Sequence, residues 1–143
     1  MQKSPAAYNN VAAVLICLGE PQRAIELLTK AINLRPKHTH EIVFFNMGRA
    51  YLMLGDNDAA IEWFLKASEK NPTNAGNYGA LATAYALKQD NAKAQAAAAE
   101  FRRLDPNGTL SAYRKQISFY PAAYKEWFES KLVPAARKAG LPE

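Results

Sequence analysis

Residues 44–72 read FFNMGRAYLMLGDNDAAIEWFLKASEKNP, and this stretch decides the fold. Its apolar residues recur at intervals of three, four and seven on both sides of a break at residues 54–57. These intervals are the period of an amphipathic helix. Gly55 can adopt the left-handed conformation that ends a helix, and Asp56 suits the start of the next one. The stretch therefore predicts two helices joined by a short turn and ended by Pro72, which cannot continue a helix.

The same pattern occurs three times along the chain. Pro36, Pro72 and Pro106 fall 36 and 34 residues apart, and each closes a similar segment. A period of about 20–50 residues is typical of a solenoid built from stacked units. The alternative is an irregular helical bundle whose prolines align by accident. Small residues that would let paired helices approach closely keep the same register: Ala12, Gly48 and Ala82 in the first helices, and Ala24, Ala60 and Ala94 in the second.

This pattern resembles the tetratricopeptide repeat (TPR), a helix–turn–helix unit of about 34 residues. The resemblance implies an all-α fold, in which three such repeats form a right-handed superhelix followed by a C-terminal helical cap. We expect a single domain over residues 1–143, with repeats at 5–38, 41–74 and 75–108 and capping helices at 109–143. Four positions depart from the family pattern: Ala12 replaces a glycine, Leu15 a tyrosine, Gln89 the turn glycine, and Ala98 a large residue.

The tail does not repeat the pattern. It predicts a short helix over residues 109–117 and a second helix from Pro121 towards Ala139, interrupted or kinked at Pro134. A terminal repeat needs a capping element, so we interpret the second helix as a cover for the third unit. Alternatively, the tail reaches into a groove of the same or another molecule. The apolar stripe that would make either contact is Tyr124, Trp127, Phe128, Leu132 and Val133.

The tail also carries a second resemblance. Residues 79–87, the triplet Phe119-Tyr120-Pro121 and the ending at residues 137–143 are similar to the C-terminal end of certain bacterial multidomain proteins. In these proteins a TPR array follows a class III adenylate/guanylate cyclase domain or a winged-helix regulatory domain. The resemblance implies the C-terminal regulatory or oligomerisation part of a larger bacterial signalling protein. Alternatively, the chain is an accessory region of an adenylate cyclase-like enzyme whose catalytic domain lies upstream.

Composition excludes several classes of protein. The chain has 143 residues, of which 49% are apolar and 22% charged, so it can bury a core and is not intrinsically disordered. No apolar run approaches the roughly 18–20 residues of a membrane span. The first five residues lack the pattern of a secretory signal. The single cysteine, Cys17, cannot form an internal disulfide, and we expect a cytoplasmic location.

The sequence contains no recognisable catalytic or cofactor motif. Gly-rich phosphate loops, nucleophile elbows, His-Glu-x-x-His and cysteine pairs are all missing. His38 and His40 are too few to hold zinc, and Cys17 is interpreted as a small buried hydrophobe. Asp56 and Asp58 suit the start of a helix better than acid–base chemistry. We therefore expect no enzyme activity, no cofactor and no metal.

The TPR resemblance implies that the first helix of each unit lines a partner-binding groove. A small apolar groove of this kind would bind an apolar helix or an extended protein segment. Self-association through the groove or the C-terminal helix is the alternative. Asn9 and Asn46 match the amides of chaperone carboxylate clamps, but Gly76 and Ala80 stand where basic residues are needed, so we expect no clamp. The predicted groove residues are Asn9, Ala13, Ile16, Ile42, Phe45, Asn46, Arg49, Leu52, Met53, Thr83 and Leu87.

The net charge of +5 raises the question of an anionic partner. The positive residues are spread along the chain, apart from the pairs Arg102-Arg103, Arg114-Lys115 and Arg137-Lys138. Nucleic-acid binding favours a continuous basic stripe with exposed aromatic residues. Binding of nucleic acid is therefore the weaker alternative.

Overall fold

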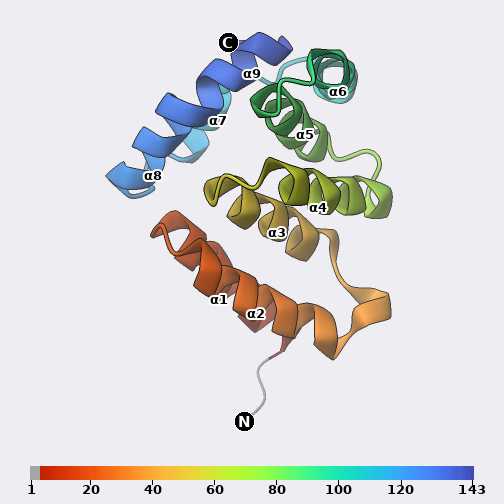
Figure 1. The fold of residues 1–143 in the computed structure, drawn as a ribbon, viewed down its shortest axis with the longest axis vertical. Coiled ribbons are helices and arrows are strands. Elements are labelled where there is room, and N and C mark those ends of the chain that lie inside the picture. Colours follow the sequence, from red (N-terminus) through yellow and green to blue (C-terminus); the bar gives the residue numbers. More distant parts are fainter. Residues whose placement is uncertain (1–3) are drawn as a thin grey trace. The chain divides into compact units, whose positions relative to one another are not determined.

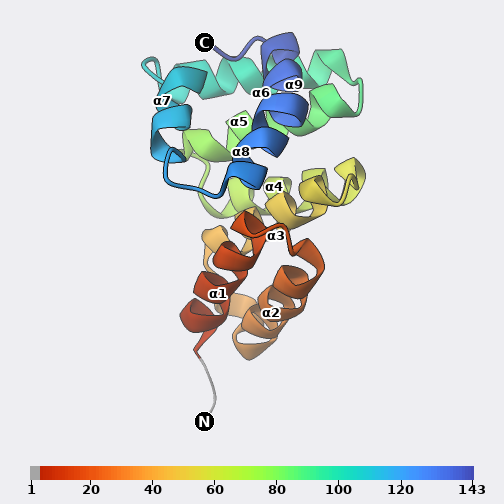
Figure 2. The same ribbon diagram turned by 90° about the vertical axis from the view of Figure 1, so that its left-hand side faces the viewer.

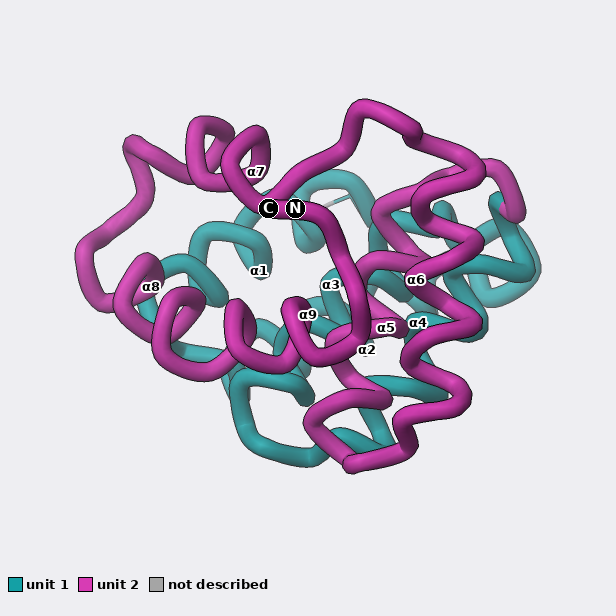
Figure 3. Tube along the Cα trace, turned by 90° about the horizontal axis from the view of Figure 1, so that it is seen from above, with its two compact units in different colours: residues 1–71 teal, residues 72–143 magenta. Residues whose placement is uncertain are grey.

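The structure, a computed structural model, describes residues 4–143, and over that range it contains helices and no strand. The predicted all-α fold is confirmed. Met1–Lys3, where a secretory signal would begin, lie outside the described residues. The helices form two compact units, Met1–Asn71 and Pro72–Glu143 (Figure 3). Their bounds are α1 (Pro5–Cys17), α2 (Pro21–Leu34), η1 (Pro36–His38), α3 (Glu41–Met53), α4 (Asn57–Lys70), α5 (Ala75–Leu87), α6 (Asn91–Leu104), α7 (Leu110–Gln116), α8 (Ala122–Trp127), η2 (Phe128–Leu132) and α9 (Val133–Ala139).

The first unit consists of two helical hairpins, α1–α2 and α3–α4 (Figure 1). The short helix η1 follows α2 and starts at Pro36, which has no N–H to continue an α-helix. The Thr39 hydroxyl, which is buried, then donates to the carbonyl of Arg35 over 3.0 Å and holds the connector. Helix α3 packs against both α2 and α1, so the second hairpin builds on the first.

Each hairpin turn ends its first helix with a residue in the left-handed conformation. Gly19 has φ 78° and Gly55 has φ 83°. At the second turn the amide of Asp56 donates to the carbonyl of Tyr51, and its carboxylate accepts from Ala59 N at 3.1 Å. The predicted capping role of Asp56 is thereby confirmed. The third turn has the same geometry without a glycine, because Gln89 takes φ 68°.

Close helix contact explains why position 48 is a glycine. A Cβ on Gly48 would lie 2.4 Å from the ring of Phe64, which is fully buried between α3 and α4. Even an alanine would therefore force the ring to move. The first hairpin solves the same problem differently, since its equivalent pair is Ala12 with the smaller Leu28, and both are fully buried.

In the third hairpin the large aromatic residue lies about one turn later in the second helix than it does in the second hairpin. Ala98 stands where the second hairpin has Phe64, and the missing volume is supplied by Phe101. The ring of Phe101 lies against Gly79, where a Cβ would come within 3.2 Å of it. The departure at Ala98 noted in the sequence is thus compensated within the same hairpin by an aromatic ring paired with a glycine.

In the second unit the C-terminal helices pack on the third hairpin. Helix α9 contacts α5 and α6 (Figure 2), as expected of a cap. The helical run from Ala122 to Ala139 is irregular just before Pro134, where an interruption or kink was expected. A π-helical turn, η2, precedes the proline, and Val133 N donates to the Phe128 carbonyl five residues back. The wider turn accommodates a proline that lacks an N–H for the regular ladder.

Replacing Gln89 by glycine should stabilise the protein. A side chain in the left-handed region is strained, and glycine removes that strain at some cost in the entropy of the unfolded chain. We expect Gln89→Gly to raise the free energy of unfolding by about 0.5–1 kcal/mol in urea titration. The matched control is Gln95→Gly inside α6, which should lower it. A loss of stability in Gln89→Gly would contradict the assigned turn geometry.

The contact between Gly48 and Phe64 can be tested by a double-mutant cycle. Gly48→Ala overpacks the hairpin and should cost about 1–3 kcal/mol of unfolding free energy. Adding Phe64→Leu reproduces the alanine–leucine pair of the first hairpin, so the double variant should be more stable than the sum of the single changes implies. Additive losses in thermal unfolding would show that the two residues do not compete for the same space.

Candidate functional site

The candidate site of the first unit is the face shared by α1 and α3. Its accessible part is apolar: Ile42 is 41% exposed, while Ala13, Phe45 and Met53 are half-buried. Arg49 is also half-buried and is the one charged member of the predicted set. Ile16 and Leu52 are buried, so they support this surface from below rather than forming it.

A polar network lies at the centre of this face and joins α1 to α3. The side-chain amide of Asn46 donates to Oδ1 of Asn9 at 2.9 Å, and both residues are buried. Oδ1 of Asn46 accepts from Nη1 of Arg49 at 3.1 Å. Buried polar groups need hydrogen-bond partners, and the Asn46 side chain has one on each side, Asn9 as acceptor and Arg49 as donor. The network holds the Arg49 guanidinium in place and ties the two hairpins together.

The apolar part of the face is supported by aromatic packing. Phe45 tilts against Phe64, with ring centroids 5.5 Å apart. Phe64 is the same ring that fills the space beside Gly48. The orientation of Phe45 at the surface therefore depends on the close approach of α3 and α4. A rigid, partly exposed aromatic ring beside a fixed guanidinium is the composition found at the centres of protein–protein interfaces.

Thr83 and Leu87, the remaining predicted groove residues, belong to α5 in the second unit. Thr83 is buried, and its hydroxyl donates to the Gly79 carbonyl of the same helix at 2.9 Å. Leu87 is half-buried. Helix α9 packs along α5, so the chain's own C-terminal segment covers part of the helix that carries both residues (Figure 2).

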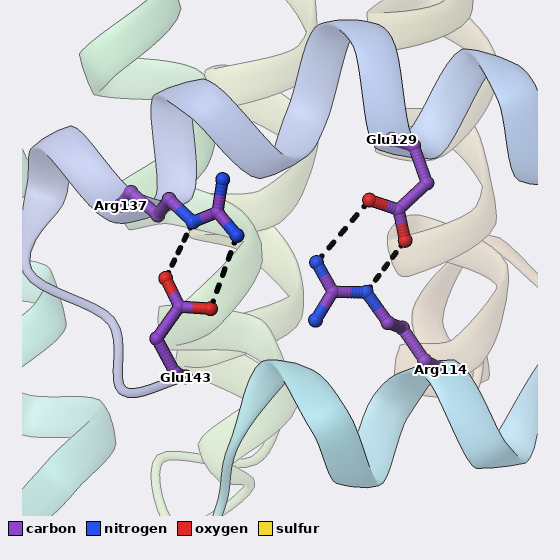
Figure 4. Close-up of polar contacts among 4 residues, drawn as sticks. All are labelled: Arg114, Glu129, Arg137 and Glu143. Carbon is purple, nitrogen blue, oxygen red and sulfur yellow. Dashed lines mark hydrogen bonds and ion pairs between the residues drawn. The ribbon is translucent and has the colours of Figure 1, made fainter.

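Two arginine–glutamate pairs lie in the C-terminal region (Figure 4): Arg114–Glu129 joins α7 to η2, and Arg137–Glu143 joins α9 to the end of the chain. Arg114 on α7 donates to Glu129 over 2.5 and 3.2 Å, and Arg137 on α9 pairs with Glu143. The hydrogen bond from Arg114 lowers the pKa of Glu129, and the hydrogen bond from Arg137 lowers the pKa of Glu143. The Arg114–Glu129 pair therefore links α7 to η2, and the Arg137–Glu143 pair holds the chain end against α9.

Aromatic and backbone contacts complete this arrangement. The ring of Tyr113 lies 5.0 Å from that of Phe128, measured between centroids. The amide of Leu110 at the start of α7 donates to the Pro142 carbonyl at 2.9 Å. Arg102 of α6 donates to the Gly140 carbonyl at 2.7 Å. The C-terminal segment thus has partners on α6 and α7.

His40 and Cys17 were considered as candidates for metal binding or catalysis, and their surroundings show other contacts. Nδ1 of His40 accepts from the Ile42 amide at 3.2 Å and so caps α3. Cys17 is half-buried rather than fully buried, and it forms no disulfide. Among residues 4–143, no group of three or more His, Cys, Asp or Glu side chains could hold a metal ion. Over the same range, no helix is both long and apolar enough to cross a membrane.

Comparison with known proteins agrees with the repeat geometry. Residues 4–73 match the family model of the tetratricopeptide repeat. The protein has the fold of a TPR solenoid. The crystal structure of MamA has a TM-score of 0.69 at 22% identity, over 94% of this chain and 75% of that chain. A second structure, of MamA protein, gives 0.68 at 24% identity, over 94% and 70%. The Sgt2 TPR domain from Aspergillus fumigatus gives 0.68 at 22% identity, over 97% and 85%.

The sequence did not reveal that Asn9 and Asn46 bond to each other. Both belong to the predicted groove residues, so the pattern alone suggested a contact with a partner. One sequence signal could have distinguished an internal hydrogen bond from a contact with a partner. Arg49 lies one turn after Asn46, where it can reach the amide oxygen. A buried amide between two helices needs a bond on each side, and the chain supplies both.

Acid should weaken the link between α7 and η2. Because the folded-state pKa of Glu129 lies below its ordinary value of 4.5, the pair stabilises the fold above that pH and loses its effect as pH falls through the lowered pKa. Glu129→Gln should therefore cost about 0.2–1 kcal/mol at neutral pH and nothing once the wild-type carboxylate is protonated. Trp127 fluorescence during urea unfolding, in a Trp63→Phe background, reports on this unit.

Glu126→Gln removes another exposed carboxylate from the same helical run and serves as the control. Its free energy of unfolding should differ little from that of the wild type, both at neutral pH and at a pH low enough to protonate Glu129. A stability difference between Glu129→Gln and the wild type that does not change with pH would contradict the ionic contribution of the pair.

Proposed function

We propose that this TPR protein is a non-catalytic interaction module that binds an apolar helical or extended segment of a partner protein. The observation that carries the proposal is the α1–α3 face. It presents Ile42, Phe45 and Met53 around Arg49, whose guanidinium is held by Asn46. An apolar surface on a fixed scaffold favours association, because little side-chain freedom is lost on binding.

The groove that we propose lies within the first unit. Thr83 and Leu87 were also predicted as groove residues. They belong to α5 of the second unit, which α9 partly covers, and are not part of this first-unit surface. We also propose a cytoplasmic location, because the single cysteine cannot form an internal disulfide.

A peptide library selected on the purified protein tests this function. We expect the selected peptides to carry apolar residues at helical spacing, and to lose about tenfold or more in affinity for Phe45→Ala. The matched control is Leu65→Ala, which truncates an exposed leucine on α4 outside the face. Peptides that bind the Phe45 variant as tightly as the wild type would contradict the proposed site.

The same assay tests the absence of a carboxylate clamp. Gly76 and Ala80 supply no charge where a clamp requires basic side chains, so an acidic chaperone-tail peptide should not bind. Micromolar binding of that peptide, abolished in Arg49→Ala, would overturn this part of the proposal.

A second candidate function is that of a regulatory or accessory region in a larger bacterial signalling protein, including an adenylate cyclase-like enzyme. It is favoured by the likeness of Phe119-Tyr120-Pro121 and of residues 137–143 to the ends of such proteins. The gene sequence upstream of the Met1 codon decides it: an open frame encoding a cyclase or winged-helix domain supports it, and a natural start at Met1 contradicts it.

A further inference from the structure

Helix α1 exposes an apolar stripe that lies outside the proposed groove. Val11 is 42% exposed, Val14 57% and Leu18, directly after the helix, 57%. With the half-buried Ala7, these residues are spaced at i, i+4, i+7 and i+11, so they share one face. The buried residues of α1 are Asn9, Ala12, Leu15 and Ile16, which lie around the other side of the helix.

The repeat itself shows what this face is built to contact. Counted from the unit-ending prolines, the equivalents of Ala7, Val11 and Val14 in α3 are Val43, Met47 and Ala50. These three are 3%, 3% and 0% exposed, and α3 packs against α2, the second helix of the preceding hairpin. Leu54, the equivalent of Leu18, stays 42% exposed. The part of the stripe formed by Ala7, Val11 and Val14 is therefore a helix-packing surface without its helix among residues 4–143.

The absence of charge on α1 favours a second copy of the same helix as its partner. Between Pro5 and Cys17, α1 contains no charged residue. In a contact between two copies related by a two-fold axis, each helix meets its own equivalent, so any charge near the axis would face the same charge. Helix α1 avoids that repulsion, and its branched aliphatic residues can interdigitate with themselves.

The other arrangement, in which copies stack head to tail, is less suitable. It would place α1 on the second helix of the last hairpin, α6, in the way that α3 sits on α2. At the positions of Ile25 and Ile32 in α2, α6 has Gln95 and Arg102. Arg102 is already bonded to the Gly140 carbonyl. The α6 face is thus more polar and partly occupied by its own tail.

We propose that α1 is a self-association surface, through which two copies of this chain pair in an isologous α1–α1 contact centred on Val11 and Val14. A pair of 13-residue helices forms a small interface, so the dimer is weak and depends on concentration. This surface differs from the α1–α3 groove, and its failure would leave the proposed function untouched.

Charge complementation tests the pairing. Sedimentation equilibrium of the full chain should show a dimer of the 15.8-kDa protein at about 300 μM, with dissociation on dilution. Val14→Glu and Val14→Lys should each be monomeric, because each places like charges within about one turn of the axis. Their equimolar mixture should recover the dimer.

Leu65→Glu is the matched control, since it puts the same charge on an exposed leucine of α4 and should still dimerise. Circular dichroism at 222 nm should be equal for all variants, which keeps loss of dimer separate from loss of fold. Three results would each overturn the proposal: a wild-type monomer throughout, a dimer that survives Val14→Glu, or a mixture that stays monomeric. Binding of an α2-sequence peptide to a monomeric wild type would assign the face to a repeat helix instead.

Discussion

The close approach of paired helices, made possible by small residues at the contact, is the constraint on which this structure depends. At Gly48 the ring of Phe64 occupies the space that a Cβ would need, and at Gly79 the ring of Phe101 presses on the backbone in the same way. The first case has a consequence at the surface. Phe64 is the ring on which Phe45 rests, so the spacing of α3 and α4 also sets the orientation of the aromatic residue at the candidate groove.

Polar groups in this protein are used more for internal connection than for display. Asn9, Asn46 and Arg49 form a chain of hydrogen bonds between α1 and α3, and it leaves a mainly apolar surface around one fixed cation. In the second unit, Arg114 bonds to Glu129, Arg137 to Glu143 and Arg102 to the Gly140 carbonyl. These bonds all lie within one unit or the other.

A repeat protein leaves a packing face at each end of its stack, because every unit buries one side of its first helix against the helix before it. The second unit covers its third hairpin with α9. In the first unit, α1 keeps aliphatic side chains at the positions that are buried in α3. The equivalent residues of α3, Val43, Met47 and Ala50, are buried, because α3 has a helix packed on that side.

The sequence by itself determined the helices and their turns, because these depend on local spacing, on glycine or aspartate at the break, and on proline at the end of each unit. It also predicted the all-α TPR fold. Only the tertiary structure decided which groove residues face solvent. Ile16, Leu52 and Asn46 lie at helical positions compatible with exposure or burial, and packing between hairpins buried all three. Likewise, the sequence predicted an interruption or kink at Pro134, and the structure shows its form, a π-helical turn over Phe128–Leu132 in front of the proline.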